Sequence, residues 1–95
     1  MKRKIDLEKL IQLKEKSEYL KGTDCWHHYH MQYESKMPNG RWAFIGWYVP
    51  YSLNKDYIVD CYIKTFKNNE YLYIEYRNGP DRWLLTESVK KALEI

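Results

Sequence analysis

Apolar and polar residues alternate along residues 57–77, in two runs rich in Tyr, Ile, Val and Phe that flank Asn68 and Asn69. β-Branched and aromatic residues favour strands, and Asn tolerates the positive φ that a two-residue hairpin turn requires. The pattern therefore predicts a β-hairpin whose turn is Asn68-Asn69. Because side chains alternate between the faces of a sheet, one face would carry the pairs Thr65–Leu72, Ile63–Ile74 and Cys61–Tyr76. The other face would carry the pairs Phe66–Tyr71, Lys64–Tyr73, Tyr62–Glu75 and Asp60–Arg77.

A second hairpin is predicted from two strand-like runs, residues 24–36 and 41–51, which flank Met37-Pro38-Asn39-Gly40. Proline fixes φ early in a turn and glycine supplies a left-handed position, which suits a short hairpin loop. Pairing Met37 with Arg41 sorts both strands into two faces. One face carries Tyr33–Ile45, Met31–Trp47 and Tyr29–Val49, and the other carries Lys36–Trp42, Glu34–Phe44 and His30–Tyr48. Glycine at position 46 is typical of either a bulge or a close approach by another segment, and a bulge there would shift the register beyond it.

Helical spacing of apolar residues marks both ends of the chain. Residues 5–21 predict an amphipathic helix with Asp6 as its N-cap and Gly22 as its stop. The run Asn-Gly-Pro-Asp at residues 78–81 predicts a turn, followed by a short strand over residues 82–85. Thr86 would then cap a final helix that ends at residue 95. In the alternative interpretation, Pro80 opens one longer helix.

These elements predict an α+β fold with an N-terminal helix, an antiparallel sheet of four or five strands built from two hairpins, and a C-terminal helix. Its 95 residues suit a single domain, residues 1–95, in which residues 1–4 are expected to fray. No apolar run approaches the ~20 residues of a membrane span. The N-terminus also lacks the apolar segment of a signal peptide, so we expect a cytoplasmic protein with Cys25 and Cys61 as free thiols.

Aromatic residues make up 17% of the chain, and their placement suggests an adhesive surface. The N-terminal helix is expected to cover the sheet face that carries Ile45, Trp47, Val49, Ile63, Leu72 and Ile74. The opposite face would expose Trp42, Phe44, Tyr48, Tyr62, Phe66, Tyr71 and Tyr73, with Trp26 beside them. Such a face would reach or exceed the ~300–600 Å² of the largest apolar patch on a typical monomer. We expect a partner protein to cover it; the alternatives are the C-terminal helix and a second copy in a homodimer.

The stretch from Cys25 to His30, with three histidines, could in principle support metal or thiol chemistry. On a strand, His28 and His30 would point the same way, and Asp60 or Tyr48 would have to complete a tetrahedral zinc site. No second pair with ligand spacing follows, so these imidazoles are interpreted as part of an aromatic sheet face, and no metal or cofactor is expected.

Catalysis is not expected from the remaining residues. Cys25 and Cys61 are predicted to face the core, where thiols behave as inert hydrophobic groups, so neither is expected to act as a nucleophile beside His27. The chain also lacks a phosphate-binding glycine loop, a nucleophile elbow and a metalloprotease helix.

These patterns predict a small non-enzymatic protein-binding module that acts through its aromatic sheet face. The predicted partner-binding residues are Trp42, Phe44, Tyr48, Tyr62, Lys64, Phe66, Tyr71, Tyr73 and Arg77. The alternative is a single-stranded RNA or DNA binding protein, because rings on an open sheet can stack on bases and the net charge is +3. Small domains with one adhesive face are common among phage and mobile-element accessory proteins, including inhibitors of host enzymes, and we expect this chain to act in that way.

Overall fold

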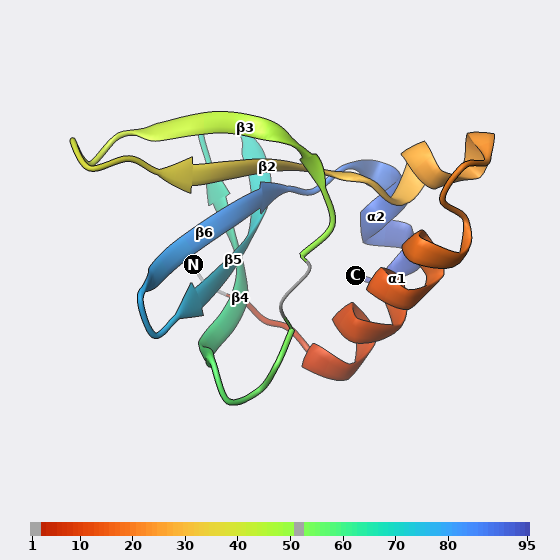
Figure 1. The fold of residues 1–95 in the computed structure, drawn as a ribbon, viewed down its shortest axis with the longest axis horizontal. Coiled ribbons are helices and arrows are strands. Elements are labelled where there is room, and N and C mark those ends of the chain that lie inside the picture. Colours follow the sequence, from red (N-terminus) through yellow and green to blue (C-terminus); the bar gives the residue numbers. More distant parts are fainter. Residues whose placement is uncertain (1–2, 51–52) are drawn as a thin grey trace.

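The computed structural model describes residues 3–50 and 53–95, which form one antiparallel sheet and two α-helices (Figure 1). In chain order the elements are β1 (Arg3–Lys4), α1 (Leu7–Tyr19), the 3₁₀-helix η1 (Asp24–Tyr29), β2 (Met31–Lys36), β3 (Trp42–Tyr48), β4 (Ile58–Phe66), β5 (Asn69–Tyr76), β6 (Gly79–Leu84) and α2 (Glu87–Ala92). The strands lie in the order β1-β4-β5-β6-β2-β3, and neighbours are antiparallel. The predicted α+β class is confirmed, although the described residues form six strands where four or five were predicted.

Both α-helices pack on the same face of the sheet, as Figure 1 shows. Leu10 and Leu13 of α1 share one core cluster with Val89 of α2 and with Leu93 just beyond it. The sheet contributes to this cluster the buried residues Met31, Cys61, Ile63, Leu72, Ile74 and Trp83. The C-terminal helix therefore does not cover the opposite face of the sheet, which rules out that alternative for the aromatic residues.

Helix α1 begins as the sequence predicts. The Asp6 side chain accepts a hydrogen bond from the backbone N–H of Glu8 at 3.0 Å, which satisfies one of the free donors of the first turn. The helix ends at Tyr19 with Leu20 as its C-cap, so it is shorter than the predicted 5–21. Gly22 adopts a φ of +90°, one position later than a glycine directly after the C-cap would lie.

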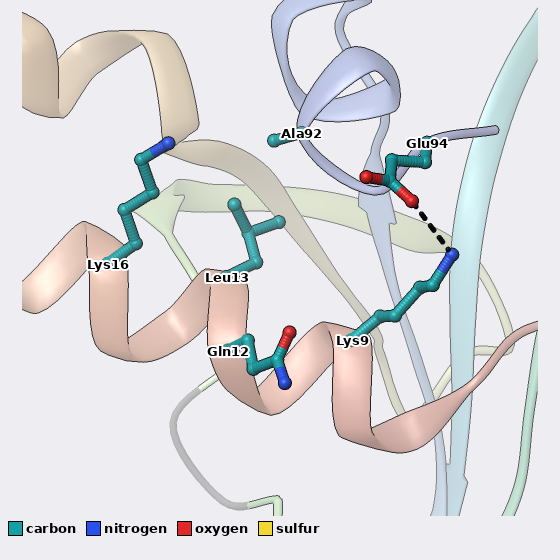
Figure 2. A pocket seen from close by; sticks show the side chains of 6 residues that line it. All are labelled: Lys9, Gln12, Leu13, Lys16, Ala92 and Glu94. Carbon is teal, nitrogen blue, oxygen red and sulfur yellow. Dashed lines mark hydrogen bonds and ion pairs between the residues drawn. The ribbon is translucent and has the colours of Figure 1, made fainter.

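The two helices meet along a shallow polar pocket. Figure 2 shows Lys9 reaching from α1 to Glu94, which lies just beyond α2, and their charged atoms are 3.3 Å apart. The lining residues are Lys9, Gln12, Leu13, Lys16, Ala92 and Glu94. Both charged partners are largely exposed, so this ion pair contributes little to stability.

The β4–β5 hairpin forms, but its turn is not the predicted Asn68-Asn69. The turn residues are Lys67 and Asn68, with φ of 50° and 69°, and the strand pairs close at Phe66 opposite Asn69. Every predicted pair is therefore displaced by two residues, so that Tyr62 lies opposite Tyr73 and not opposite Glu75. A displacement of two residues preserves the alternation of faces. The predicted face of each residue is thus retained although its partner is wrong.

The β2–β3 hairpin follows the predicted register only as far as its bulge. Met37 N–H donates to Arg41 O at 2.7 Å, and Glu34 lies opposite Phe44 as predicted. The register then shifts, and Tyr33 lies opposite Gly46. The expected bulge near Gly46 is therefore confirmed, since β3 has one extra residue between these pairs.

The bulge reverses the faces of the residues that follow it. Trp47 lies opposite Gln32, and Tyr48 lies opposite Met31, where the regular register would have paired Met31 with Trp47. The prediction that Ile45 and Trp47 lie beneath the helix is wrong, because both side chains are exposed. Val49 is buried but belongs to neither core cluster, so its position beneath the helix stays a prediction. The predicted end of this strand at residue 51 lies outside the described residues.

Residues 24–29 form the 3₁₀-helix η1, so the strand predicted from residue 24 begins only at Met31. Trp26 N–H bonds to Thr23 O, and His30 N–H bonds to His27 O, as the tight 3₁₀ spacing requires. This turn brings the Trp26 ring to 3.9 Å from the His30 ring, between centroids. Residues 24–29 therefore lack the extended conformation that their strand propensity predicted, and the 3₁₀ turn instead brings two aromatic side chains into contact.

The C-terminal prediction of a strand followed by a capped helix is confirmed. Thr86 caps α2, with its side chain accepting from Val89 N–H at 3.3 Å. Strand β6 is longer than predicted, because its turn is Arg77-Asn78 and Gly79 already pairs with Tyr76. Helix α2 ends at Ala92 and does not continue to residue 95.

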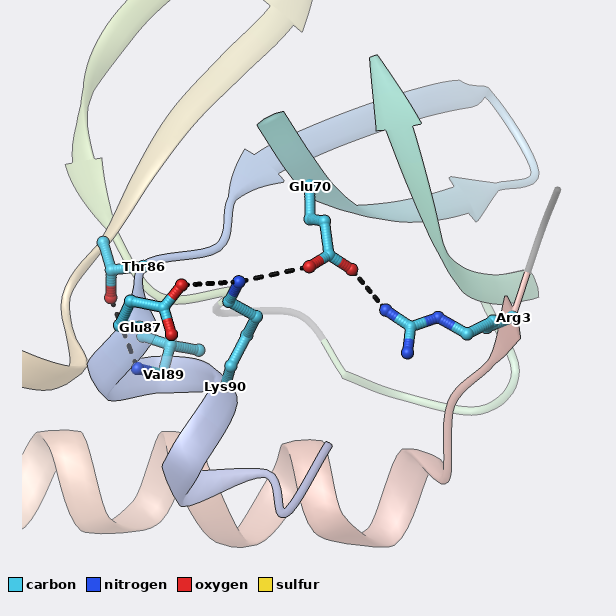
Figure 3. A network of polar contacts seen from close by, with 6 residues as sticks. All are labelled: Arg3, Glu70, Thr86, Glu87, Val89 and Lys90. Atoms are coloured by element: carbon cyan, nitrogen blue, oxygen red, sulfur yellow. Dashed lines mark hydrogen bonds and ion pairs between the residues drawn. The ribbon is translucent and has the colours of Figure 1, made fainter. Parts of the chain in front are cut away.

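Arg3 and Lys4, which belong to the segment expected to fray, form β1 against Ile63 and Tyr62 of β4. Figure 3 shows how charge holds this strand: Glu70 of β5 pairs with Arg3 on one side and with Lys90 of α2 on the other. Glu70 thereby connects β1 to α2. Residues 1 and 2, included in the same prediction, lie outside the described residues.

Candidate functional site

A row of five side chains crosses the sheet on the face opposite the helices, which we call the outer face. The strand pairings place one residue from each of five adjacent strands in line: Tyr62, Tyr73, Arg82, Glu34 and Phe44. Directly opposed side chains in an antiparallel sheet share a face and contact one another. The outer face therefore carries one continuous band from β4 to the edge strand β3.

Arg82 lies at the centre of this band and is only 6% exposed. Its Nε donates to Glu34 Oε2 at 2.6 Å, and its Nη1 donates to the Tyr73 hydroxyl at 3.3 Å. Three ring centroids lie close to its Cζ, at 4.6 Å for Trp42, 4.6 Å for Tyr71 and 4.8 Å for Phe66. A guanidinium is planar, weakly hydrated and attracted to ring faces. The outer face thus encloses a cation within aromatic rings.

Three tyrosines of the outer face form a second core cluster. Tyr62, Tyr71 and Tyr73 are buried, with Trp42 and Leu84 packed against them. Tyr62 and Tyr73 stack with centroids 5.4 Å apart and ring planes 8° from parallel. The prediction that these three rings lie exposed is wrong, because they cover one another.

The Tyr62 hydroxyl is hydrogen-bonded within the outer face, and its pKa is raised. It donates to Glu75 Oε1 at 3.1 Å. Burial, together with this hydrogen bond and the negative charge of Glu75, raises the pKa of Tyr62 to about 12. Burial also raises the pKa of Tyr71, with the nearby Glu34 carboxylate as the next cause. Both phenols therefore stay neutral at physiological pH, so the charge at the centre of the band is that of the Arg82–Glu34 pair.

Edge strand β3 presents the largest exposed apolar side chains of the sheet. It pairs only with β2, and four of its side chains are close to half exposed: Phe44 52%, Ile45 46%, Trp47 52% and Tyr48 44%. We call these four side chains the β3 edge surface. Sequence reasoning found Phe44 and Tyr48 but missed Ile45 and Trp47. The signal that could have found them is Gly46, since a bulge there exposes what a regular strand would bury.

An aromatic slot lies where the outer face meets η1. Its lining consists of Trp26, His27, His30 and Trp47. The His30 ring is buried between the two indoles, with centroids 3.9 Å from Trp26 and 6.0 Å from Trp47. Burial, and secondarily the neighbouring His27, lowers the pKa of His30. The slot is therefore lined by aromatic groups, and its buried member, His30, is uncharged near neutral pH. Trp26 and His30 were placed at the aromatic face from sequence, whereas His27 and Trp47 were not.

The predicted partner-binding residues do not form one surface. Phe66 is 39% exposed and Trp42 is half-buried, and both border the Arg82 guanidinium. Lys64 is exposed opposite Tyr71, whereas Arg77 is exposed in the turn between β5 and β6. Tyr48 leaves the outer face at the bulge and packs on Tyr33, with centroids 5.1 Å apart. Phe44 alone of the predicted set belongs to both the outer band and the β3 edge surface.

The thiols and imidazoles do not assemble into a reactive centre. Cys25 is exposed on η1, so its predicted position in the core is wrong, whereas Cys61 is buried as expected. Burial, with a contribution from Asp60, raises the pKa of Cys61 to about 12. His28 and His30 lie on a 3₁₀-helix and its end, which removes the strand alternation on which the zinc hypothesis depended. Among the described residues, no three His, Cys, Asp or Glu side chains cluster as metal ligands would.

Comparison with known proteins does not assign this chain to a family. No family model, no curated protein and no solved structure matches it. In residues 3–50 and 53–95, no helix has the length and apolar character needed to cross a membrane. The indication of function comes from the surfaces described above.

Proposed function

We propose that this chain is a small, non-enzymatic protein-binding module that docks a partner protein through the β3 edge surface and the adjoining rim of the outer face. The observation that carries this proposal is the exposure of four large apolar side chains on one edge strand. Natural sheets usually protect an edge with charges, prolines or a covering element. The stretch from Trp42 to Tyr48 has no charged residue and no proline.

The size of this surface suits the centre of an interface. A large aromatic side chain can bury about 150–250 Å², so four half-exposed side chains offer on the order of 400 Å². That area is divided between the two faces of β3, because Trp47 lies opposite Gln32 and Tyr48 lies opposite Met31, so a partner would wrap around this edge strand. Together the four side chains would supply about half of the ~800 Å² that each partner buries in a standard interface. Trp and Tyr are also the residues most enriched among the anchors of such interfaces.

The same geometry favours a protein over a single-stranded nucleic acid. Base stacking needs open ring faces, but Tyr62 and Tyr73 stack on each other, and the Tyr71 ring faces Arg82. The Arg82 guanidinium, central to the face, is already paired with Glu34 and cannot serve a phosphate. The outer face therefore offers fewer stacking platforms than its sequence predicted, and the Arg82 cation is not free for a phosphate.

We further propose that the module acts by occupancy. A domain with an adhesive edge and no assembled reactive groups alters its partner by covering one of the partner's surfaces or by holding it in a complex. Such coverage would inhibit a partner enzyme whose functional surface it occupies.

Capture with matched variants tests the proposal. The immobilised chain would be exposed to an extract of its native host, and the retained proteins compared with those on a Phe44→Ser/Trp47→Ser variant. A Tyr57→Ser variant is the control, because Tyr57 is 56% exposed but lies outside β3. We expect a specific protein to be retained by wild type and Tyr57→Ser and lost by the double variant. Equal retention by all three folded chains would refute a role for the β3 edge surface.

A further inference from the structure

The two edges of the sheet are built in opposite ways. One edge is β1, which has two residues, both basic. The other is β3, which has seven residues and none charged. A short charged edge strand resists pairing with another chain, whereas a long apolar one invites it. We infer that β3 accepts an extended segment of a partner protein as an added strand, with a large uncharged side chain of that segment in the aromatic slot and an acidic residue near the β2–β3 turn.

This inference rests on the proposed protein-binding function and specifies how the partner is held. Backbone pairing would supply affinity, and the slot would supply specificity, as in other complexes formed by strand addition.

The backbone of β3 has hydrogen-bonding groups available for such a strand. Met37 N–H donates to Arg41 O at 2.7 Å, which makes Met37–Arg41 a hydrogen-bonded pair. Hydrogen-bonded and non-hydrogen-bonded pairs alternate along an antiparallel ladder. The next pairs are Lys36–Trp42, Ser35–Ala43 and Glu34–Phe44. The backbone N–H and C=O groups of Trp42 and Phe44 are therefore directed away from β2, toward the open edge.

The slot determines the side chain that the partner must supply. Trp47 belongs to β3 and also lines the slot, so a strand added to β3 passes beside it. The lining residues Trp26, His27, His30 and Trp47 include no carboxylate, Lys or Arg. An ionised guest would lose hydration there without gaining a charged partner. The fitting guest is therefore an aromatic or large aliphatic side chain.

Positive charge at the other end of β3 determines where the partner segment must carry an acidic residue. Lys36 and Arg41 are exposed beside Trp42, and neither forms an ion pair with another described residue. An acidic residue on the added strand would complement them. On β2, Lys36 lies opposite Trp42 and Gln32 lies opposite Trp47, so four positions of a regular strand, about 14 Å at 3.4 Å per residue, span the two sites. The acidic residue and the apolar residue of the partner should therefore be separated by four positions, which also keeps them on the same face.

The composition of β3 disfavours a second copy of this chain as the added strand. Strand β3 has seven residues, and none of them is acidic. A second β3 would therefore not supply the carboxylate that complements Lys36 and Arg41. A regular segment of a partner can pair with β3 across its bulge, as β2 does on the other side of β3.

Synthetic peptides test the chemistry of the added strand. The probe is a capped peptide of about seven residues, with Glu at one end, Trp near the other and alternating Thr and Val between them. Its matched controls carry Lys in place of Glu or Ser in place of Trp. We expect each control to bind about tenfold more weakly, by fluorescence of a label on the peptide. Equal binding of the three peptides, or no binding, would overturn the inference.

Two N-methylated isomers of the Glu/Trp peptide test backbone pairing directly. Methylation at alternate positions removes either the N–H groups that face β3 or those that face solvent. We expect one isomer to lose binding by about tenfold or more and the other to retain it, because only one of the two sets of N–H groups donates to β3. Equal weakening of both isomers would overturn strand addition.

The protein itself supplies the complementary test. Phe44→Pro removes an outward N–H without removing a bond to β2, whereas Phe44→Ala removes only the ring. We expect Phe44→Pro to weaken peptide binding about tenfold more than Phe44→Ala, because only the proline variant also removes the backbone donor; equal weakening by the two variants would contradict strand addition. If wild type self-associates by sedimentation, or binds a single-stranded oligonucleotide that displaces the peptide, the edge has another occupant and the inference fails. If host-protein capture still depends on Phe44 and Trp47 while the peptide tests fail, only strand addition is refuted and the proposed function stands.

Discussion

Arg82 and Glu34 form an ion pair on the outer face, with Arg82 Nε 2.6 Å from Glu34 Oε2 and the two side chains 7% and 22% exposed. The pair joins β6 to β2, and the rings of Trp42, Tyr71 and Phe66 surround its cation. A charge removed from water in this way must be paired to be tolerated. The ion pair therefore decides that the centre of the outer face is a core and that only its edge remains available to a partner.

Truncating the two members of this pair should have unequal effects. Glu34→Ala leaves the buried guanidinium without its counter-charge and should lower the free energy of unfolding by about 3 kcal/mol. Arg82→Met retains most of the packing volume and leaves a carboxylate that water reaches more easily, so a loss of about 1 kcal/mol is expected. Urea denaturation of both variants provides the comparison. Equal losses would contradict an ion pair in which the cation is the more buried member.

Aromatic residues of the outer face should separate into a stabilising class and a neutral class. Tyr73→Ala removes a buried ring that stacks on Tyr62 and should cost about 3 kcal/mol of unfolding free energy. Phe44→Ala removes a ring that is 52% exposed and should change stability by less than about 0.5 kcal/mol. Thermal or urea unfolding measures both. A large loss from Phe44→Ala would mean that the β3 edge surface belongs to the fold.

The position of the β4–β5 turn can be tested by substitution. Lys67 and Asn68 both have positive φ, and Asn-Gly is the preferred pair for such a turn. Lys67→Asn/Asn68→Gly should therefore raise the free energy of unfolding by about 0.5–1 kcal/mol. Asn69→Gly, within β5, is the matched control and should lower it by about the same amount. The reverse order of stabilities would place the turn at Asn68-Asn69.

Acidification should destabilise the fold through His30. The folded pKa of His30 lies below its ordinary value of 6.5, because burial disfavours the charged ring and His27 is nearby. Between these two pKa values the unfolded chain binds more protons than the folded chain, so stability is complete above pH 6.5 and falls as the pH drops toward the folded pKa. His30→Gln should show a shallower fall over this range. Urea midpoints measured at several pH values test this, and identical slopes for the two proteins would contradict it.

The two hairpins show which features of the sheet the local sequence pattern determines: it gives the face of a residue but not its cross-strand partner. The face of each residue in β4 and β5 follows from alternation, but the partner of each does not, because a displacement by two residues leaves both faces unchanged. The stacking of Tyr62 on Tyr73 belongs to the observed register and not to the one that turn chemistry favoured. In the same way, Gly46 signalled a bulge, but only pairing with β2 shows that the bulge turns Trp47 outward.

The aromatic slot could not be predicted from these patterns. Residues 24–29 have the composition of a strand, yet they form η1, in which the Trp26 ring packs on His30. His30 in turn neighbours Trp47, which lies on a different strand. A contact between segments so far apart along the chain leaves no periodic signal in either one.

By itself, the sequence determined the helix cap at Asp6, the capped helix after Thr86, the loop at residues 37–40 and the α+β class, because each depends on residues that are neighbours along the chain. Only the tertiary structure decided which aromatic rings are core and which meet solvent. Burial of a ring depends on which side chains of other strands cover it. The rings of Trp42 from β3 and Phe66 from β4 both contact the Arg82 guanidinium. That convergence buries the centre of the outer face and leaves the edge strand β3 exposed.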